Sequence, residues 1–204
     1  MKKIKLYTYI KLVVFLLLMF IAVKFPSNIF DTIIADLIEI KVLATTAKII
    51  SLVFNDKLLL LIMILLSAFL VWIKEVKKAV FIFFSAGIGG FLLFTIKYTV
   101  QRVRPLPEVH DGFSFPSGHS TFVALFFLAL LFVINKKEIL SAIATFAIIA
   151  VPISRMVLGA HFLTDVVAGV LLGSMVVDVM KVYYIDIYDF IVKKLGKNKW
   201  INLN

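Results

Sequence analysis

The chain has 204 residues, of which 62% are hydrophobic, and its mean hydropathy is +1.07. A soluble domain has a hydrophobic share nearer about half, so this composition indicates a membrane protein. The net charge is +10 at pH 7, which in a soluble chain would suggest a nucleic-acid partner but in a membrane protein can report orientation instead. Cysteine is absent, which excludes disulfides, thiolate catalysis and cysteine-ligated metal sites.

Six apolar segments are candidate transmembrane helices, because at roughly 20 residues a span a chain of 204 residues has room for about six. We therefore expect residues 1–204 to form one integral-membrane domain, an all-α bundle of six transmembrane helices. The predicted spans cover residues 8–25, 57–73, 79–97, 119–134, 139–154 and 161–181. An even number of spans places both termini on the same side of the membrane.

The segment between the first two spans, residues 28–54, fits neither a span nor a plain loop. Its apolar residues repeat at helical spacing, but it carries charges at Asp31, Asp36, Glu39, Lys41 and Lys48. We predict one or two helices that lie in the membrane interface. The alternative is a seventh buried helix, which would place several charges in hydrocarbon at about 2.5 to 3.5 kcal/mol each.

The distribution of charge predicts the orientation. If the amino terminus is cytoplasmic, the inner segments hold 14 of the 22 basic residues and 5 of the 12 acidic ones, a net charge of +9. The outer face then keeps a net charge of +1. The positive-inside rule favours this orientation. We therefore expect a multi-pass protein of the cytoplasmic membrane with both termini in the cytoplasm. The positive charge then needs no nucleic-acid partner, and the expected partner is the lipid bilayer.

Three polar segments fall at helix ends on the predicted outer face. Their basic residues supply fixed positive charge and N–H donors, which suit the oxygens of a phosphoryl group. Ser117 and Gly118 stand where the fourth span begins, so free backbone N–H groups and the helix dipole favour an anion there. The sequence thus predicts a phosphate site from Lys97, Arg104, Ser117, Gly118 and Arg155.

Two histidines and one aspartate complete this set. His161 and Asp165 are four residues apart at a helix start and therefore share one face. A carboxylate there can hold the imidazole proton on one nitrogen and leave the other free to attack phosphorus. His119 then remains as the general acid for the departing oxygen. We predict phosphoryl transfer with His161, His119 and Asp165 as catalytic residues and without a metal ion or cofactor.

These segments resemble the three signatures of the type 2 phosphatidic acid phosphatase (PAP2) superfamily. The signatures are Lys-x6-Arg-Pro at 97–105, Pro-Ser-Gly-His at 116–119 and Ser-Arg-x5-His-x3-Asp at 154–165, and all eleven prescribed residues match. The resemblance covers residues 57–182 and implies a six-helix bundle, a phosphohistidine intermediate on His161 and metal-independent hydrolysis. It also implies acid catalysis by His119 and phosphate binding by the five residues named above.

A site at helix ends on the outer face meets substrates whose head groups lie at the membrane surface, so we expect a membrane lipid phosphate. The resemblance implies undecaprenyl pyrophosphate, with phosphatidylglycerophosphate or phosphatidic acid as alternatives. A phosphotransferase that passes the group to another lipid is a related alternative. From another class, the chain could be a lipid transporter or a non-catalytic phosphate-lipid-binding protein, but binding alone does not need His119, His161 and Asp165.

Two further features remain open at this point. Gly169 and Gly173 are four apart in the sixth span, which lets another helix approach closely. We expect packing inside the monomer, and a homodimer interface is the alternative. The linker between the first two signatures contains polar residues that either contact the head group or face water, namely Arg102, Glu108, His110 and Asp111.

Overall fold

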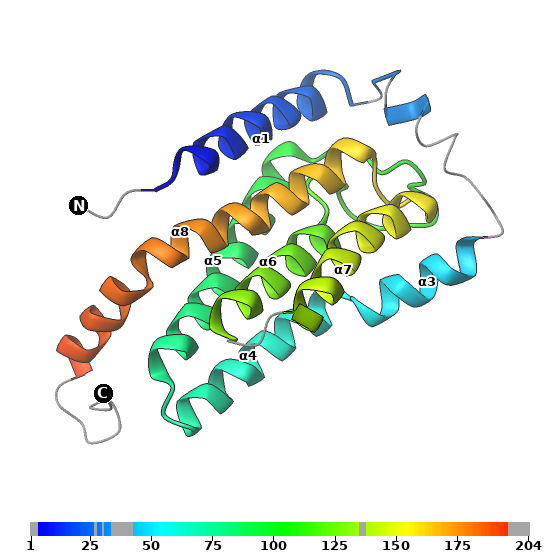
Figure 1. Cartoon of the computed structure of the whole chain (residues 1–204). Helices are drawn as coiled ribbons and strands as arrows, with labels where there is room; N and C mark the ends of the chain where they lie inside the picture. Colours follow the sequence, from blue (N-terminus) through cyan, green and yellow to red (C-terminus); the bar gives the residue numbers. More distant parts are fainter. Residues whose placement is uncertain (1–3, 27, 30, 34–42, 135–137, 196–204) are drawn as a thin grey trace.

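The computed structural model describes residues 4–195 apart from 27, 30, 34–42 and 135–137. The regular elements of this part of the chain are all helices, which confirms the predicted all-α class. The helices lie side by side in an elongated bundle (Figure 1). They are α1 (Leu6–Lys24), α3 (Ala44–Val53), α4 (Asp56–Trp72), α5 (Val76–Val100), α6 (Gly118–Val133), α7 (Glu138–Val157) and α8 (Leu163–Leu195).

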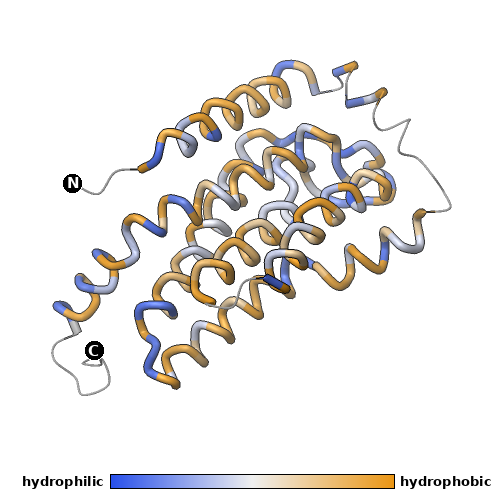
Figure 2. Tube along the Cα trace, viewed as in Figure 1, coloured by the Kyte–Doolittle hydropathy of each residue, from blue (hydrophilic) through white to orange (hydrophobic). Residues whose placement is uncertain are grey.

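The helices have the length and composition of membrane spans. Figure 2 shows hydrophobic residues along their middles and hydrophilic residues toward their ends. Within the described residues, five stretches are long and apolar enough to cross a membrane, so the chain is a multi-pass membrane protein: Leu6–Lys24, Ala44–Trp72, Val76–Val100, Glu138–Val157 and Leu163–Lys194. α6 is apolar but has 16 residues, fewer than the roughly 20 that a span needs. The predicted count of six spans depends on α6 and stays a prediction.

The first five predicted spans agree with helices whose ends lie within three residues of the expected positions. The sixth predicted span falls largely within α8, a longer helix that ends at Leu195. Tyr184 explains the extension. Its ring packs against those of Phe81 and Phe132, with centroids 5.5 and 5.6 Å apart, so the far part of α8 is held by the beginning of α5 and the end of α6.

The segment predicted to lie in the interface is only partly described, because residues 34–42 fall outside the described part. Its last turns form α3, which packs along α7 (Figure 1). α3 and α4 together make one apolar stretch of 29 residues. Asn55 separates the two helices, since its side chain caps α4 by accepting hydrogen bonds from the N–H groups of Lys57 and Leu58 at 3.0 and 3.2 Å. The interfacial location of residues 28–54 stays a prediction.

α6 occupies the centre of the bundle, and glycines let α8 approach it closely. A Cβ atom on Gly169 would lie 2.6 Å from the carbonyl oxygen of Ser117, and one on Gly173 would collide with the carbonyl oxygen of Thr121. Any side chain at either position would push the helices apart. This confirms the expectation that the two glycines serve packing inside the monomer.

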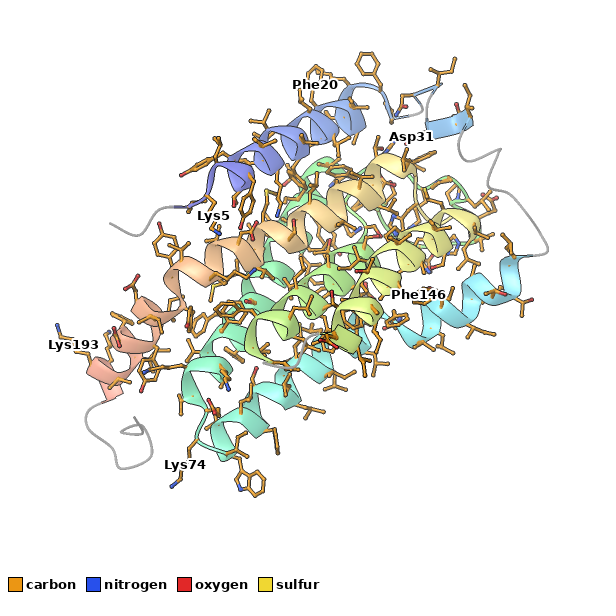
Figure 3. All side chains as sticks on the ribbon, viewed as in Figure 1. Lys5, Phe20, Asp31, Lys74, Phe146 and Lys193 are labelled. Atoms are coloured by element: carbon orange, nitrogen blue, oxygen red, sulfur yellow. The ribbon has the colours of Figure 1, made fainter. Side chains whose placement is uncertain are left out.

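α1 is tied to the rest of the bundle by a few specific contacts. Lys11 forms a 2.7 Å ion pair with Asp178 of α8. The ring of Phe15 lies against that of Phe115, with centroids 5.9 Å apart. α1 thereby carries the chain that follows it, including Asp31, to the end of the bundle where α8 begins (Figures 1 and 3).

Candidate active site

The three polar segments meet at one end of the bundle, where α5 and α7 end and α4, α6 and α8 begin (Figure 1). Arg104 joins the first segment to the third, because its Nη1 lies 3.2 Å from Nε2 of His161. The backbone N–H of Ser117 joins the second to the third by donating to the carbonyl oxygen of Asp165 at 3.0 Å. Figure 3 places the labelled Lys74 and Lys193 at the opposite end of the molecule.

His161 and Asp165 form the centre of the site. His161 is buried in the loop between α7 and α8, and Asp165 is buried in the first turn of α8. The imidazole Nδ1 faces Oδ2 of Asp165 at 3.7 Å, which is longer than a hydrogen bond. Among the described residues this buried nitrogen has no hydrogen-bond partner. The ring thus presents Nδ1 to the carboxylate and Nε2 to Arg104, and a small rotation would close the Nδ1 hydrogen bond.

The surroundings of His161 keep its ring neutral. Burial lowers the pKa of His161 to about 3, and the neighbouring Asp165 offsets only part of that effect. At neutral pH the imidazole therefore holds one proton, which the carboxylate favours on Nδ1. The lone pair on Nε2 then accepts a hydrogen bond from Arg104 in this structure, and it can attack phosphorus once a bound phosphate takes over that donor.

A buried group of three residues holds the carboxylate of Asp165. Arg102 donates from Nη1 to Oδ1 of Asp165 at 2.6 Å and from Nη2 to Oδ2 of Asp31 at 2.8 Å. Asp31 in turn accepts hydrogen bonds from the N–H and hydroxyl of Thr164, at 3.0 and 2.6 Å. Arg102 and Asp31 are 2% and 1% exposed. We call Asp31, Arg102 and Thr164 the carboxylate support.

The carboxylate support was not predicted. The linker analysis left Arg102 open between the head group and water, and Asp31 was placed among the charges of an interfacial helix. The signal that points to Asp31 is an acid in a mainly apolar segment, because an acid in such surroundings is usually paired and functional.

His119 has an acidic partner from another helix. Its Nδ1 lies 3.7 Å from Oδ2 of Asp56, the first residue of α4. A Cβ atom on Gly118 would lie 2.5 Å from the same Oδ2. Gly118 therefore leaves room for the Asp56 carboxylate beside His119, a role that the sequence did not reveal. Asp56 itself was missed, because in the sequence it stands as an ordinary acid in the first turn of a helix.

Arg155 lies near the end of α7 and contacts α3. Its Nη1 donates to the hydroxyl of Ser51 at 2.5 Å. Its Nε is buried and, within the described residues, has no hydrogen-bond partner. Part of the guanidinium thus remains available to an anion.

The other predicted phosphate ligands also hold the loop between α5 and α6. Lys97 donates from Nζ to the carbonyl oxygens of Phe113 and Pro116 at 2.8 and 2.9 Å, which leaves one of its three N–H donors. Arg104 donates from Nε to the carbonyl of Asp111 at 2.9 Å. The hydroxyl of Ser117 caps α6 by accepting from the N–H of Ser120, so the groups at this position that could bind an anion are the first N–H groups of the helix. Phosphate binding by these residues stays a prediction.

The chain matches a family model and several known proteins. The PAP2 superfamily model matches residues 78–187. A phosphatidylglycerophosphatase B of Bacillus subtilis is 33% identical over 134 residues, which are 60% of this chain and 66% of that protein. A lipid A 1-phosphatase of Rhizobium johnstonii is 32% identical over 111 residues, which are 46% of this chain and 43% of that protein. The chain thus spans just under two thirds of the first relative and less than half of the second.

Two crystal structures share the fold. The transmembrane PAP2-type phosphatidylglycerolphosphate phosphatase of Bacillus subtilis has a TM-score of 0.69 and 25% identity, over 94% of this chain and 98% of that one. Aquifex aeolicus LpxE has a TM-score of 0.62 and 19% identity, over 77% of this chain and 98% of that one. Since the family match includes all three motifs that converge on His161, the chain belongs to the PAP2 superfamily.

Proposed function

We propose that the chain is a lipid phosphatase, which hydrolyses a phosphomonoester or pyrophosphate of a membrane lipid at the outer face of the cytoplasmic membrane. The observation that carries this proposal is the orientation of His161, whose Nε2 faces Arg104 at 3.2 Å while its Nδ1 faces Asp165. We also propose that α6 is a sixth span and that both termini are cytoplasmic. The concentration of basic residues at the end remote from the site supports that topology.

The geometry supports a two-step reaction. In the first step Nε2 of His161 attacks phosphorus, the bond from phosphorus to the leaving oxygen breaks, and His119 donates a proton to that oxygen. Asp165 stabilises the positive charge that develops on the phosphorylated imidazole. In the second step His119 removes a proton from water, the water oxygen attacks phosphorus, and the bond between phosphorus and Nε2 breaks to release inorganic phosphate.

Asp56 lies 3.7 Å from Nδ1 of His119 and opposes the repulsion of a protonated ring by Arg155. A negative charge next to an imidazole stabilises its protonated form. The phosphate group of the substrate adds further negative charge to the same pocket and offsets the cations of Arg104 and Arg155.

Undecaprenyl pyrophosphate is the substrate that we propose first, for recycling of the carrier lipid. Phosphatidylglycerophosphate is the second candidate, because one relative and one related structure are phosphatases named for that lipid. Phosphatidic acid is the third.

The test is an assay of the purified full chain on these three lipids, with inorganic phosphate release as the measurement. We expect release from at least one lipid, fastest from undecaprenyl pyrophosphate, and an unchanged rate with a chelator because the proposed chemistry needs no metal ion. A chain that only binds or transports lipid phosphates would release none. Strong inhibition by the chelator would contradict the proposed mechanism.

The variant His119→Ala tests the proton donor. We expect kcat for the lipid phosphate to fall by about 100-fold to 10,000-fold, because its alkoxide or phosphate leaving group needs a proton. With p-nitrophenyl phosphate, whose leaving group is stable without one, the loss is much smaller. The matched control is His110→Ala, because Nε2 of His110 is hydrogen-bonded to the carbonyl oxygen of Leu158, at 2.8 Å, and His110 is not among the proposed reacting groups. Equal losses on both substrates for His119→Ala would contradict its acid role.

A further inference from the structure

An apolar groove lies between α3 and α7, next to the proposed phosphate site. Its volume is about 320 Å³, the lower end of the range for small-molecule pockets. Several of its lining side chains are exposed, with Phe146 59% and Ile149 56% exposed. Its lining includes Ala47 and Ile50 of α3 and Phe146, Ala150, Ile153 and Ser154 of α7. Figure 3 labels Phe146 on the side of α7 that faces α3.

The groove and the site share a wall. Ile50 and Ser154 line the groove, and the next residue in each helix, Ser51 and Arg155, reaches the site. The hydrogen bond from Arg155 to the hydroxyl of Ser51 joins α3 and α7 at this boundary. The buried Nε of Arg155 has no partner among the described residues. A single molecule with an anionic head and an apolar chain would therefore place the head near Arg155 and the chain in the groove.

We propose that the groove between α3 and α7 binds the part of the substrate's apolar chain that adjoins its phosphate. This inference rests on the proposed function. The volume fits a segment of a chain and not a whole lipid, so the remainder would stay in the bilayer. Because lipid tails are as apolar as the groove, transfer between them yields little free energy. The groove therefore acts mainly by orienting the phosphate toward His161.

A second apolar pocket of similar size provides a matched control. It lies between α1, α5 and α8, has a volume of about 310 Å³, and is lined by residues that include Leu12 and Met175. Leu12 is 43% exposed, so it can be modified from outside. Leu12 belongs to α1, which lies on the opposite side of the bundle from α3 (Figure 1).

The test uses the absence of cysteine from the chain. The variants Ala150→Cys and Leu12→Cys each contain a single thiol, which a bulky maleimide can modify after the protein has folded. The purified full chain is assayed before and after modification on undecaprenyl pyrophosphate, phosphatidylglycerophosphate, phosphatidic acid and p-nitrophenyl phosphate. The last substrate has no apolar chain, so it reports the integrity of the reacting groups.

We expect modification of Ala150→Cys to lower kcat/KM for the hydrolysed lipid at least about tenfold and to leave p-nitrophenyl phosphate hydrolysis within about twofold. Modification of Leu12→Cys should change neither. Equal losses on lipid and p-nitrophenyl phosphate, no loss on the lipid, or the same loss in both variants would overturn the groove proposal alone. An unmodified parent that hydrolyses none of the four substrates would overturn the proposed function, and this inference with it.

Discussion

His161→Ala is expected to release no measurable phosphate from a lipid phosphate, although the variant inserts and folds as the parent does. Loss of the attacking nitrogen removes the covalent route, and in enzymes of this kind such a loss lowers kcat by about 10,000-fold or more. Folding should survive because Asp165 keeps its hydrogen bonds from Arg102 and from the N–H of Phe162, at 2.6 and 2.9 Å. The truncation also removes a buried Nδ1 that has no partner within the described residues.

The measurement combines steady-state phosphate release with trapping of the intermediate. Parent protein mixed briefly with radiolabelled substrate and quenched in alkali should carry a phosphate that is labile to acid, as expected for a phosphohistidine. His161→Ala should carry none, and His110→Ala should label as the parent does. Appreciable turnover by His161→Ala, or equal labelling of that variant, would contradict the assignment of the nucleophile.

The ends of the helices were predictable where an apolar run stops at polar residues. Leu58 to Ile73 and Ala79 to Ile96 are runs of this kind, and α4 and α5 match them closely. The far part of α8 was not predictable, because acids and lysines interrupt its apolar pattern. There the helix is held by contacts with distant residues, such as Tyr184 on Phe81, and a local pattern does not record such contacts.

The proximity of the proposed reacting groups was predictable, but the residues that hold them were not. His161 and Asp165 stand at helical spacing in one segment, so sequence separation alone indicates their proximity. Asp31 and Asp56 reach the same end of the bundle from other helices and from far along the chain. A charged residue in a mainly apolar segment is compatible with an interfacial helix or with a buried ion pair, and the packing of α1 against α8 decides between these for Asp31.

The proposed phosphate ligands were also predictable only in part. Lys97 and Ser117 were selected for charge and for position at a helix start. In the structure both also fix the loop between α5 and α6, through the carbonyl of Pro116 and the first turn of α6. Sequence spacing identifies which groups can bind an anion, but not how many of their donors the fold already uses.

Arg102→Met is expected to inactivate the site indirectly, because Arg102 lies between two buried carboxylates and is not one of the proposed phosphate ligands. Its removal leaves Asp31 and Asp165 without their shared cation, and breaking a buried ion pair in this way costs about 3 to 5 kcal/mol. We expect a lower thermal midpoint and a large fall in kcat. KM should change little, since the proposed phosphate ligands Arg104 and Arg155 are kept.

Two further variants separate positioning from stability. Arg102→Lys keeps the charge, but an ammonium cannot bridge two carboxylates with the planar geometry of a guanidinium. Relative to Arg102→Met, we expect Arg102→Lys to recover more of the thermal midpoint than of kcat. In Asp31→Asn combined with Arg102→Met, one of the two unpaired charges is gone, so the thermal midpoint should recover relative to Arg102→Met while kcat stays low. A kcat within about twofold of the parent in Arg102→Met would refute the positioning role. Because Arg102 contacts Asp165 at 2.6 Å and Asp31 at 2.8 Å, it couples the chain after α1 to the orientation of the catalytic carboxylate.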